Sequence, residues 1–247
     1  MSMSSTNRHE YLKTFGFDGD VPVDLHGRRV TAVYVYPASV RLWHWLTALS
    51  VLVLCVTGYF IGAPLPTLSG PGRHFLMGYI RFAHFTAAWV FAVGLIFRVC
   101  YAIFFGNPFS REIFVLPVLS RQWWKEFFQE LLWYLFVVRY PRKYIGHNPC
   151  SQAAMFTFFI IAVLMTCSGF ALFSEGLGRN SWAYHLFGWV FAVFGGSSLS
   201  LHEWHRLGMW SIVLFVMVHV YSAIREDIMS RQSIISTMIS GFRMFKN

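Results

Sequence analysis

The chain has 247 residues, of which 56% are hydrophobic and only 13% are charged, and its mean hydropathy is +0.50. A soluble domain usually carries about 25% charged residues, so this composition excludes an ordinary soluble protein and predicts one that lies mostly in lipid. The net charge of +9 does not indicate a nucleic-acid partner, because the basic residues flank apolar stretches.

Four segments are long and apolar enough to cross a bilayer, which requires about 20 residues each. We expect residues 1–33 to form a polar N-terminal arm, and residues 34–247 to form one membrane domain. The predicted fold is an all-α integral membrane protein with four transmembrane helices in an up-down bundle. The expected spans are about 42–61, 79–105, 149–173 and 204–224.

The distribution of basic residues predicts the orientation of these spans. Lys and Arg precede the first span, fill the loop between the second and third, and follow the fourth. By the positive-inside rule, both termini are therefore expected to be cytoplasmic. Residues 121–138 mix charge with aromatic side chains and predict an amphipathic helix at the cytoplasmic interface, or an extension of a neighbouring span. Residues 182–194 are expected on the outer side, where they could cover the outer face or contact a partner.

Two histidines on the expected fourth span, His205 and His219, indicate cofactor binding. Their separation of 14 residues corresponds to roughly 21 Å along a helix and only about 40° of rotation. Both rings would face the same way, near opposite sides of a hydrocarbon core about 30 Å thick. His44 and His84 lie on two other spans, and the topology places His84 at the depth of His205 and His44 at that of His219.

Four histidines at two matched depths are the ligand set that two stacked bis-histidine haems require. The expected pairs are His84 with His205 on the outer side, and His44 with His219 on the inner side. No C-x-x-C-H motif occurs, so both haems would be held non-covalently. His202 is a runner-up ligand at the membrane edge.

A different class of function would use the same histidines for protons or metal. A haem-free transporter or assembly protein is the alternative of this kind. A proton relay would need intramembrane carboxylates, but the sequence has none between His84 and Arg98 or between His205 and His219. Polar groups in lipid are costly and usually functional, so purely structural roles for all four histidines are disfavoured.

Residues around the histidines fit the same interpretation, although each has a simpler alternative. Gly58 follows His44 by 14 residues and could leave room for a porphyrin at the outer depth, or serve helix packing. Arg81 and Arg206 could bind haem propionates through charge-assisted bonds, or extend toward the interface and set topology.

Several segments together resemble one known family. These are RLWHWLTALSVLVLCVTGYFIG, MGYIRFAHF, IGHNP, HEWHRLGMW and VHVYSAIREDIMSRQSIISTMISGF. From about Tyr34 to its C-terminus, the chain resembles the b-type cytochrome subunit of membrane-bound nickel–iron uptake hydrogenases. The cytochrome b subunit of formate dehydrogenase shares the four-histidine plan, and it is the nearest alternative.

The resemblance implies an electron-transfer subunit in the bacterial inner (cytoplasmic) membrane. It would anchor the hydrogenase small and large subunits on the outer face and pass their electrons through two haem b groups to quinone. The family's haem ligands match His44, His84, His205 and His219. The hydrogen-activating site would belong to the hydrogenase, with no such site in this chain.

Quinone reduction takes up two protons as well as two electrons, so a protonatable group is expected near the ring. On the inner side, His147 and Asn148 in the GHNP segment are the preferred candidates, and Glu226 and Asp227 are others. Free N–H groups at the start of the third span could bind a quinone carbonyl. Alternatively, GHNP is only a turn and helix cap.

Overall fold

The computed structural model describes residues 31–64, 74–106, 108–139, 142, 144, 146–230 and 233–245. Most of the predicted N-terminal arm therefore lies outside the described residues. The elements are β1 (Thr31–Tyr34), α2 (Ala38–Gly62), α3 (His74–Phe104), α4 (Pro108–Arg111), α5 (Arg121–Tyr134), α6 (Pro149–Leu177), α7 (Trp182–Phe187), α8 (Trp189–Val193), α9 (Ser198–Met229), α10 (Ile234–Ser240) and β2 (Phe242–Phe245).

Four helices within the described ranges are long and apolar enough to cross a membrane, and the chain is a multi-pass membrane protein. They are α2, α3, α6 and α9, so each of the four predicted spans is confirmed as a helix. The helices are longer than predicted: α6 continues to Leu177, and α9 runs from Ser198 to Met229. Their polar ends extend the hydrogen-bonded backbone beyond the apolar stretch that the sequence pattern identifies.

The long helices and several loops are divided between two compact units. One unit comprises residues 43–101 and 157–217, and we call it the histidine unit. The other comprises residues 1–42, 102–156 and 218–247, and we call it the terminal unit. The boundaries between the two units fall within the long helices.

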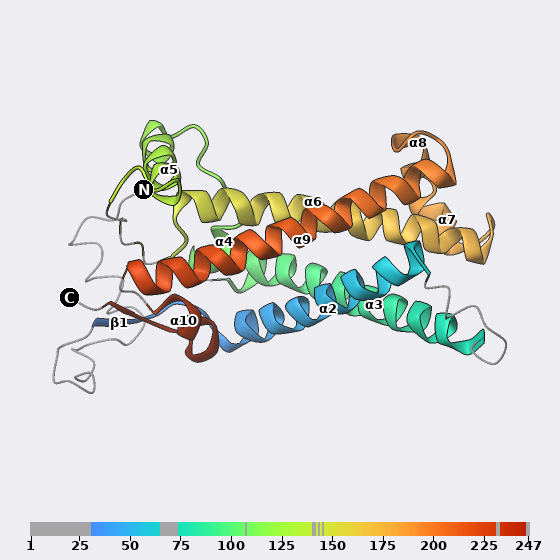
Figure 1. Cartoon of the computed structure of the whole chain (residues 1–247), viewed down its shortest axis with the longest axis horizontal. Coiled ribbons are helices and arrows are strands. Elements are labelled where there is room, and N and C mark those ends of the chain that lie inside the picture. Colours follow the sequence, from blue (N-terminus) through green and yellow to red (C-terminus); the bar gives the residue numbers. More distant parts are fainter. Residues whose placement is uncertain are drawn as a thin grey trace. The chain divides into compact units, whose positions relative to one another are not determined.

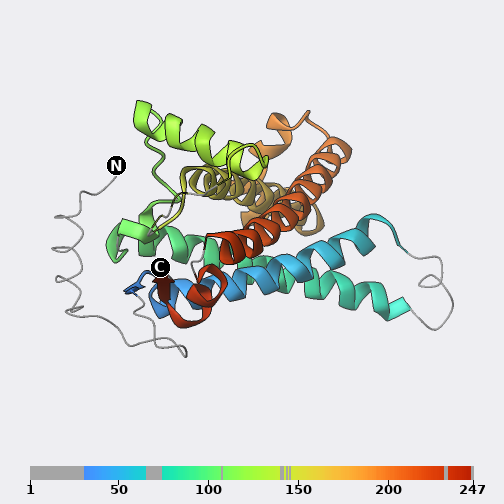
Figure 2. The same ribbon diagram turned by 60° about the vertical axis from the view of Figure 1, so that its left-hand side comes forward.

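The core of the histidine unit is formed by one buried side chain from each long helix. These are Val51, Phe91, Ala162 and Ile212. Helices α2 and α3 run side by side in this unit (Figures 1 and 2). Large apolar side chains point outward from the same helices; Leu52 is 61% exposed and Ile96 is 64% exposed. This inside-out distribution suits helices surrounded by lipid, which is as apolar as the core.

The segment expected on the outer side, 182–194, forms two short helices, α7 and α8, separated at Gly188. A side chain at Gly188 could not be accommodated, because its Cβ would lie 2.6 Å from the carbonyl oxygen of Tyr184. Val190 of α8 is buried against Ala171 and Leu201. This contact fastens the short helices to α6 and α9.

The terminal unit contains a two-stranded antiparallel sheet that the all-α prediction did not include. Strand β1 pairs with β2, with Tyr34 opposite Phe242, and α10 lies beside them (Figure 1). Gly241 precedes β2 with a φ of 88°, and its carbonyl oxygen accepts a bond of 2.9 Å from the Val35 N–H. Two four-residue strands so far apart in sequence leave no local pattern, so the prediction missed them.

The amphipathic segment expected at 121–138 is confirmed as a helix over 121–134, and Arg225 of α9 fixes its C-terminal end. The Arg225 guanidinium donates 2.7 Å bonds to the carbonyl oxygens of Trp133 and Tyr134, and lies 4.3 Å from the centre of the Trp133 ring. Trp133 is only 1% exposed. Both carbonyls lie in the last turn of α5, where the regular helix bonds run out. The Trp133 carbonyl oxygen also accepts a bond of 3.0 Å from the Phe136 N–H, and Arg225 supplies a charged donor to both.

Replacing Arg225 should therefore loosen α5. We expect Arg225→Met to lower the free energy of unfolding by about 3 kcal/mol, because two buried carbonyls lose a charged donor. Thermal unfolding of the purified protein in detergent measures the change. The control is Arg121→Met, which removes an exposed cation from the other end of α5. Equal midpoints for the two variants would contradict the role given to Arg225.

Candidate functional site

His84 on α3 contacts a hydroxyl group on α2. Thr57 Oγ1 lies 2.9 Å from His84 Nδ1, and the same hydroxyl donates a hydrogen bond of 2.6 Å to the carbonyl oxygen of Val53. Thr57 is buried, so water does not replace this contact. The long apolar sequence of α2 thus places one polar side chain against the imidazole.

His205 on α9 has a matching arrangement with α6. Ser168 Oγ lies 2.7 Å from His205 Nδ1 and donates to the carbonyl oxygen of Met165 at 3.2 Å. Ser168 is buried as well. Within the described residues, neither His84 nor His205 forms a hydrogen bond through Nε2. Each ring therefore uses one nitrogen for the protein and keeps the other available.

A glycine follows each of the two hydroxyl residues and contacts the same ring. A Cβ at Gly58 would lie 3.3 Å from His84 Cε1, and a Cβ at Gly169 would lie 3.3 Å from His205 Cε1. Such contacts are tighter than ordinary packing, so any side chain at these positions would press on the imidazole. The structure places Gly58 beside His84, one of the two predicted outer ligands.

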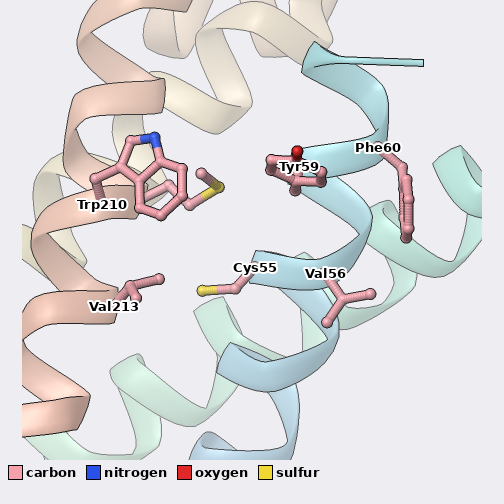
Figure 3. Close-up of a pocket in the computed structure, with 7 residues that line it drawn as sticks. Cys55, Val56, Tyr59, Phe60, Trp210 and Val213 are labelled. Carbon is pink, nitrogen blue, oxygen red and sulfur yellow. The ribbon is translucent and has the colours of Figure 1, made fainter. Parts of the chain in front are cut away.

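The two rings belong to the same unit. A groove of about 310 Å³ opens nearby between α2 and α9 (Figure 3). Met209 lines it and would lie 3.6 Å from a Cβ at Gly58, so the groove adjoins the histidine pair. In Figure 3 Cys55 points across the groove toward Val213. The groove is lined by Cys55, Val56, Tyr59, Phe60, Met209, Trp210 and Val213.

The two residues of the second predicted pair, His44 and His219, belong to different units. His44 lies on α2 in the histidine unit and His219 on α9 in the terminal unit, and both are half-buried. Their pairing stays a prediction that rests on the sequence spacing. Arg81 and Arg206, the predicted propionate partners, are exposed, which fits either role that the sequence allowed.

The terminal unit brings His147 together with two residues that the sequence did not connect to it. The Tyr36 hydroxyl lies 3.3 Å from His147 Nε2. Glu112 Oε2 accepts a bond of 2.9 Å from the His147 backbone N–H and lies 3.3 Å from Nδ1. Gly146 makes this approach possible, because a Cβ there would overlap the Glu112 carboxylate.

Asn148 takes the capping role that the sequence offered as an alternative. Its Oδ1 accepts a bond of 2.7 Å from the Ser151 N–H at the start of α6, and its Nδ2 donates to Tyr134 and Glu226. Tyr134 also donates a 2.6 Å bond to Glu226 Oε1. Burial and the Glu226 carboxylate raise the pKa of Tyr134, so its hydroxyl stays protonated.

The terminal unit also contains a buried carboxyl group. Glu130 of α5 is 2% exposed and accepts a 3.3 Å bond from the backbone N–H of Arg142. Burial raises the pKa of Glu130 to about 7, with a further contribution from the Glu226 charge. The terminal unit therefore holds one group that keeps its proton, Tyr134, and one that can exchange a proton near neutral pH, Glu130.

Comparison with known proteins assigns these features to a family. A family model described as prokaryotic cytochrome b561 matches residues 35–241. The chain belongs to this family.

Three relatives carry closely similar names. The "Probable Ni/Fe-hydrogenase B-type cytochrome subunit" of Azotobacter vinelandii is 61% identical over 222 residues, which cover 89% of this chain and 92% of that protein. The protein of the same name from Rhizobium leguminosarum bv. viciae is 56% identical over 229 residues, covering 91% and 95%. The "Probable Ni/Fe-hydrogenase 1 B-type cytochrome subunit" of Escherichia coli (strain K12) is 50% identical over 222 residues, covering 88% and 93%. The resemblance found in the sequence motifs is confirmed.

As a b-type cytochrome the chain holds haem b. The residues of the histidine unit fit this group, because the unit holds two imidazoles whose Nε2 forms no hydrogen bond with the described residues, and an apolar groove beside Gly58. Thr57, Ser168 and Gly169 lie on predicted spans, but the sequence did not connect them to the histidines. A hydroxyl residue followed by glycine was the available signal, but this dipeptide is common in membrane helices and becomes informative only beside an imidazole.

Filling the space at Gly58 should disturb the site. We expect Gly58→Leu to displace the His84 ring and to reduce haem content to half that of the wild type or less, because the new side chain would meet the imidazole. Pyridine haemochrome quantification of the purified protein measures the content. Gly62→Leu, on the same helix, is the matched control, since nothing lies within 4 Å of its Cβ position. Equal losses in both variants would contradict the specific contact.

Proposed function

We propose that this chain anchors a nickel–iron hydrogenase to the membrane and transfers its electrons to the quinone pool through two haem b groups. The presence of His84 and His205 in one unit, each with Nδ1 against a buried hydroxyl, is the observation that carries this proposal. The names of the relatives support the hydrogenase as the partner.

The chain's own residues would supply both axial ligands at each haem. His84 and His205 would hold the outer haem, and His44 and His219 the inner one. When bound, haem b supplies one-electron transfer. Iron held by two imidazoles would suit electron transfer without substrate binding, which would make the subunit a carrier. Hydrogen activation would then belong to the partner's large subunit.

The distribution of positive charge supports an orientation for this path. With both termini cytoplasmic, the His84–His205 pair would face the outer side of the bacterial inner membrane, where the hydrogenase small subunit would dock. Helices α7 and α8 lie on that side and expose two large aromatic side chains: Trp182 is 50% exposed and Trp189 is 60% exposed. Exposed tryptophans of this kind suit a protein partner or the lipid interface.

At the cytoplasmic end, the contacts of His147 support a role in proton delivery to quinone. The His147 ring contacts both the Tyr36 hydroxyl and the Glu112 carboxylate. After His147 donates a proton, these neighbouring groups can pass another proton to its ring. Asn148, the other predicted quinone residue, uses its side-chain oxygen to cap α6 and its amide group to bind Tyr134 and Glu226. We therefore place the proton-donating role on His147.

Two alternatives predict different observations. A formate dehydrogenase cytochrome subunit would co-purify with a molybdenum enzyme, whereas this proposal requires a nickel–iron enzyme. The high identity to hydrogenase-named relatives favours the latter. A haem-free transporter or assembly protein would show no haem absorbance at all.

The haem count tests the ligand pairs. We expect two haem b groups per wild-type chain and one in His205→Ala, His84→Ala or the double variant of the two, because each change removes the same site. His219→Ala should also leave one, and combining it with His205→Ala should leave none. Pyridine haemochrome quantification measures each value. A wild-type protein without haem, expressed with an adequate haem supply, would overturn the electron-transfer function.

The proton-donating role of His147 has its own test. In the complex with hydrogenase, we expect His147→Gln to leave haem reduction by hydrogen unchanged and to slow reoxidation by quinone about 100-fold, since a positioned acid contributes at least that much. Stopped-flow absorbance measures both rates. His185→Gln, which changes an exposed histidine on the outer side, is the control. Unchanged reoxidation in His147→Gln would remove His147 from the quinone site.

A further inference from the structure

We propose that Thr57 and Ser168 are positioning residues that fix the proton of His84 and of His205 on Nδ1, and so direct each Nε2 to the outer haem iron. This inference rests on the proposed function, because it assigns a role within the proposed outer site. It concerns two hydroxyl groups on α2 and α6, helices that supply neither outer ligand.

The direction of the two hydrogen bonds follows from counting protons. A hydroxyl group has one proton to donate and two lone pairs that accept. Thr57 donates its proton to the Val53 carbonyl oxygen, which can only accept. The remaining contact, to His84 Nδ1, therefore requires the imidazole to donate.

The same count applies to the second ring. Ser168 donates to the carbonyl oxygen of Met165, so its contact with His205 Nδ1 also requires an N–H on the imidazole. A neutral imidazole with its proton on Nδ1 carries its lone pair on Nε2. Both histidines are thus held in the tautomer in which Nε2 carries the lone pair and can bind iron.

A glycine beside each hydroxyl leaves room for the ring. A Cβ at Gly58 or Gly169 would lie 3.3 Å from Cε1, the ring carbon between the two nitrogens, while the preceding hydroxyl contacts Nδ1. The hydrogen bond sets the proton, and the missing side chain lets the ring reach the hydroxyl. The same hydroxyl–glycine pair therefore occurs on two helices, one for each ligand.

A neutral acceptor has a physical advantage at this position. A carboxylate would fix the same tautomer, but a charge within the hydrocarbon region is costly. A hydroxyl satisfies the N–H without adding charge, and it still raises the basicity of the ligand. Its removal should weaken the ligand and favour ferrous over ferric iron.

Other hydroxyl groups on α6 show what an ordinary helix bond looks like. Thr166 donates to the carbonyl oxygen of Ala162 at 2.8 Å, and Ser174 donates to that of Ala171 at 2.6 Å. Within the described part of the chain, neither hydroxyl contacts a histidine. They are matched controls for Thr57 and Ser168, because substituting them removes the same kind of bond from a hydroxyl to a helix carbonyl.

The test compares Thr57→Val and Ser168→Ala with Thr166→Val and Ser174→Ala in the full-length protein. We expect the first two to weaken haem retention about 10–100-fold, the usual effect of losing a ligand's hydrogen-bond partner. They should also raise the midpoint potential of one haem, by about 59 mV for each tenfold change in the relative affinity for ferrous and ferric iron. Thr57→Ser should restore both values. Haem dissociation kinetics and a redox titration followed by absorbance measure them.

Two results would overturn the inference. One is a wild-type potential and haem retention in both Thr57→Val and Ser168→Ala. The other is an equal effect of Thr57→Val and Thr57→Ser, which would indicate a packing role. If Thr57→Val does not fold, Ser168→Ala decides the matter, since it only removes an atom. Absence of haem from the wild type would instead refute the proposed function, so the two failures are distinguishable.

Discussion

A polar group in lipid has no water to bind, and this constraint shapes the site. Each intramembrane imidazole of the outer pair must find a partner for one nitrogen inside the protein. Thr57 and Ser168 supply that partner from neighbouring helices, at 2.9 Å and 2.7 Å. Because both hydroxyls already donate to their own helix, they fix the direction of the bond as well. The same contacts that satisfy the rings also prepare them as ligands.

The terminal unit follows the same constraint with different groups. Arg225 satisfies the last carbonyls of α5, Asn148 caps α6, and Glu112 accepts from the backbone of His147. Packing of this kind fixes the positions of protonatable groups, including the Glu130 carboxyl, whose pKa of about 7 reflects its burial. The histidine unit thus holds residues suited to the proposed electron transfer, and the terminal unit holds residues suited to the proposed proton delivery.

Membership of the prokaryotic cytochrome b561 family and the geometry of the His84–His205 pair support each other. The family indicates haem b, and α2 and α6 each place a buried hydroxyl against one of the two histidines that we propose as outer ligands. The groove beside Gly58 and Met209 is apolar, as a site for the hydrocarbon part of a cofactor must be. Function in this protein therefore depends on contacts between helices, with each single helix contributing one or two polar atoms.

The sequence by itself determined the four spans, because apolar runs of this length have few other stable outcomes, and the span topology predicted one depth for His84 and His205. Only tertiary structure decided which side chains meet each ring, because Thr57 and Ser168 are 27 and 37 residues from their histidines along the chain. It also gave Asn148 its helix-cap contact with Ser151, and paired β1 with β2 across nearly the whole sequence. Such contacts depend on how helices and strands pack, and local composition carries no record of that packing.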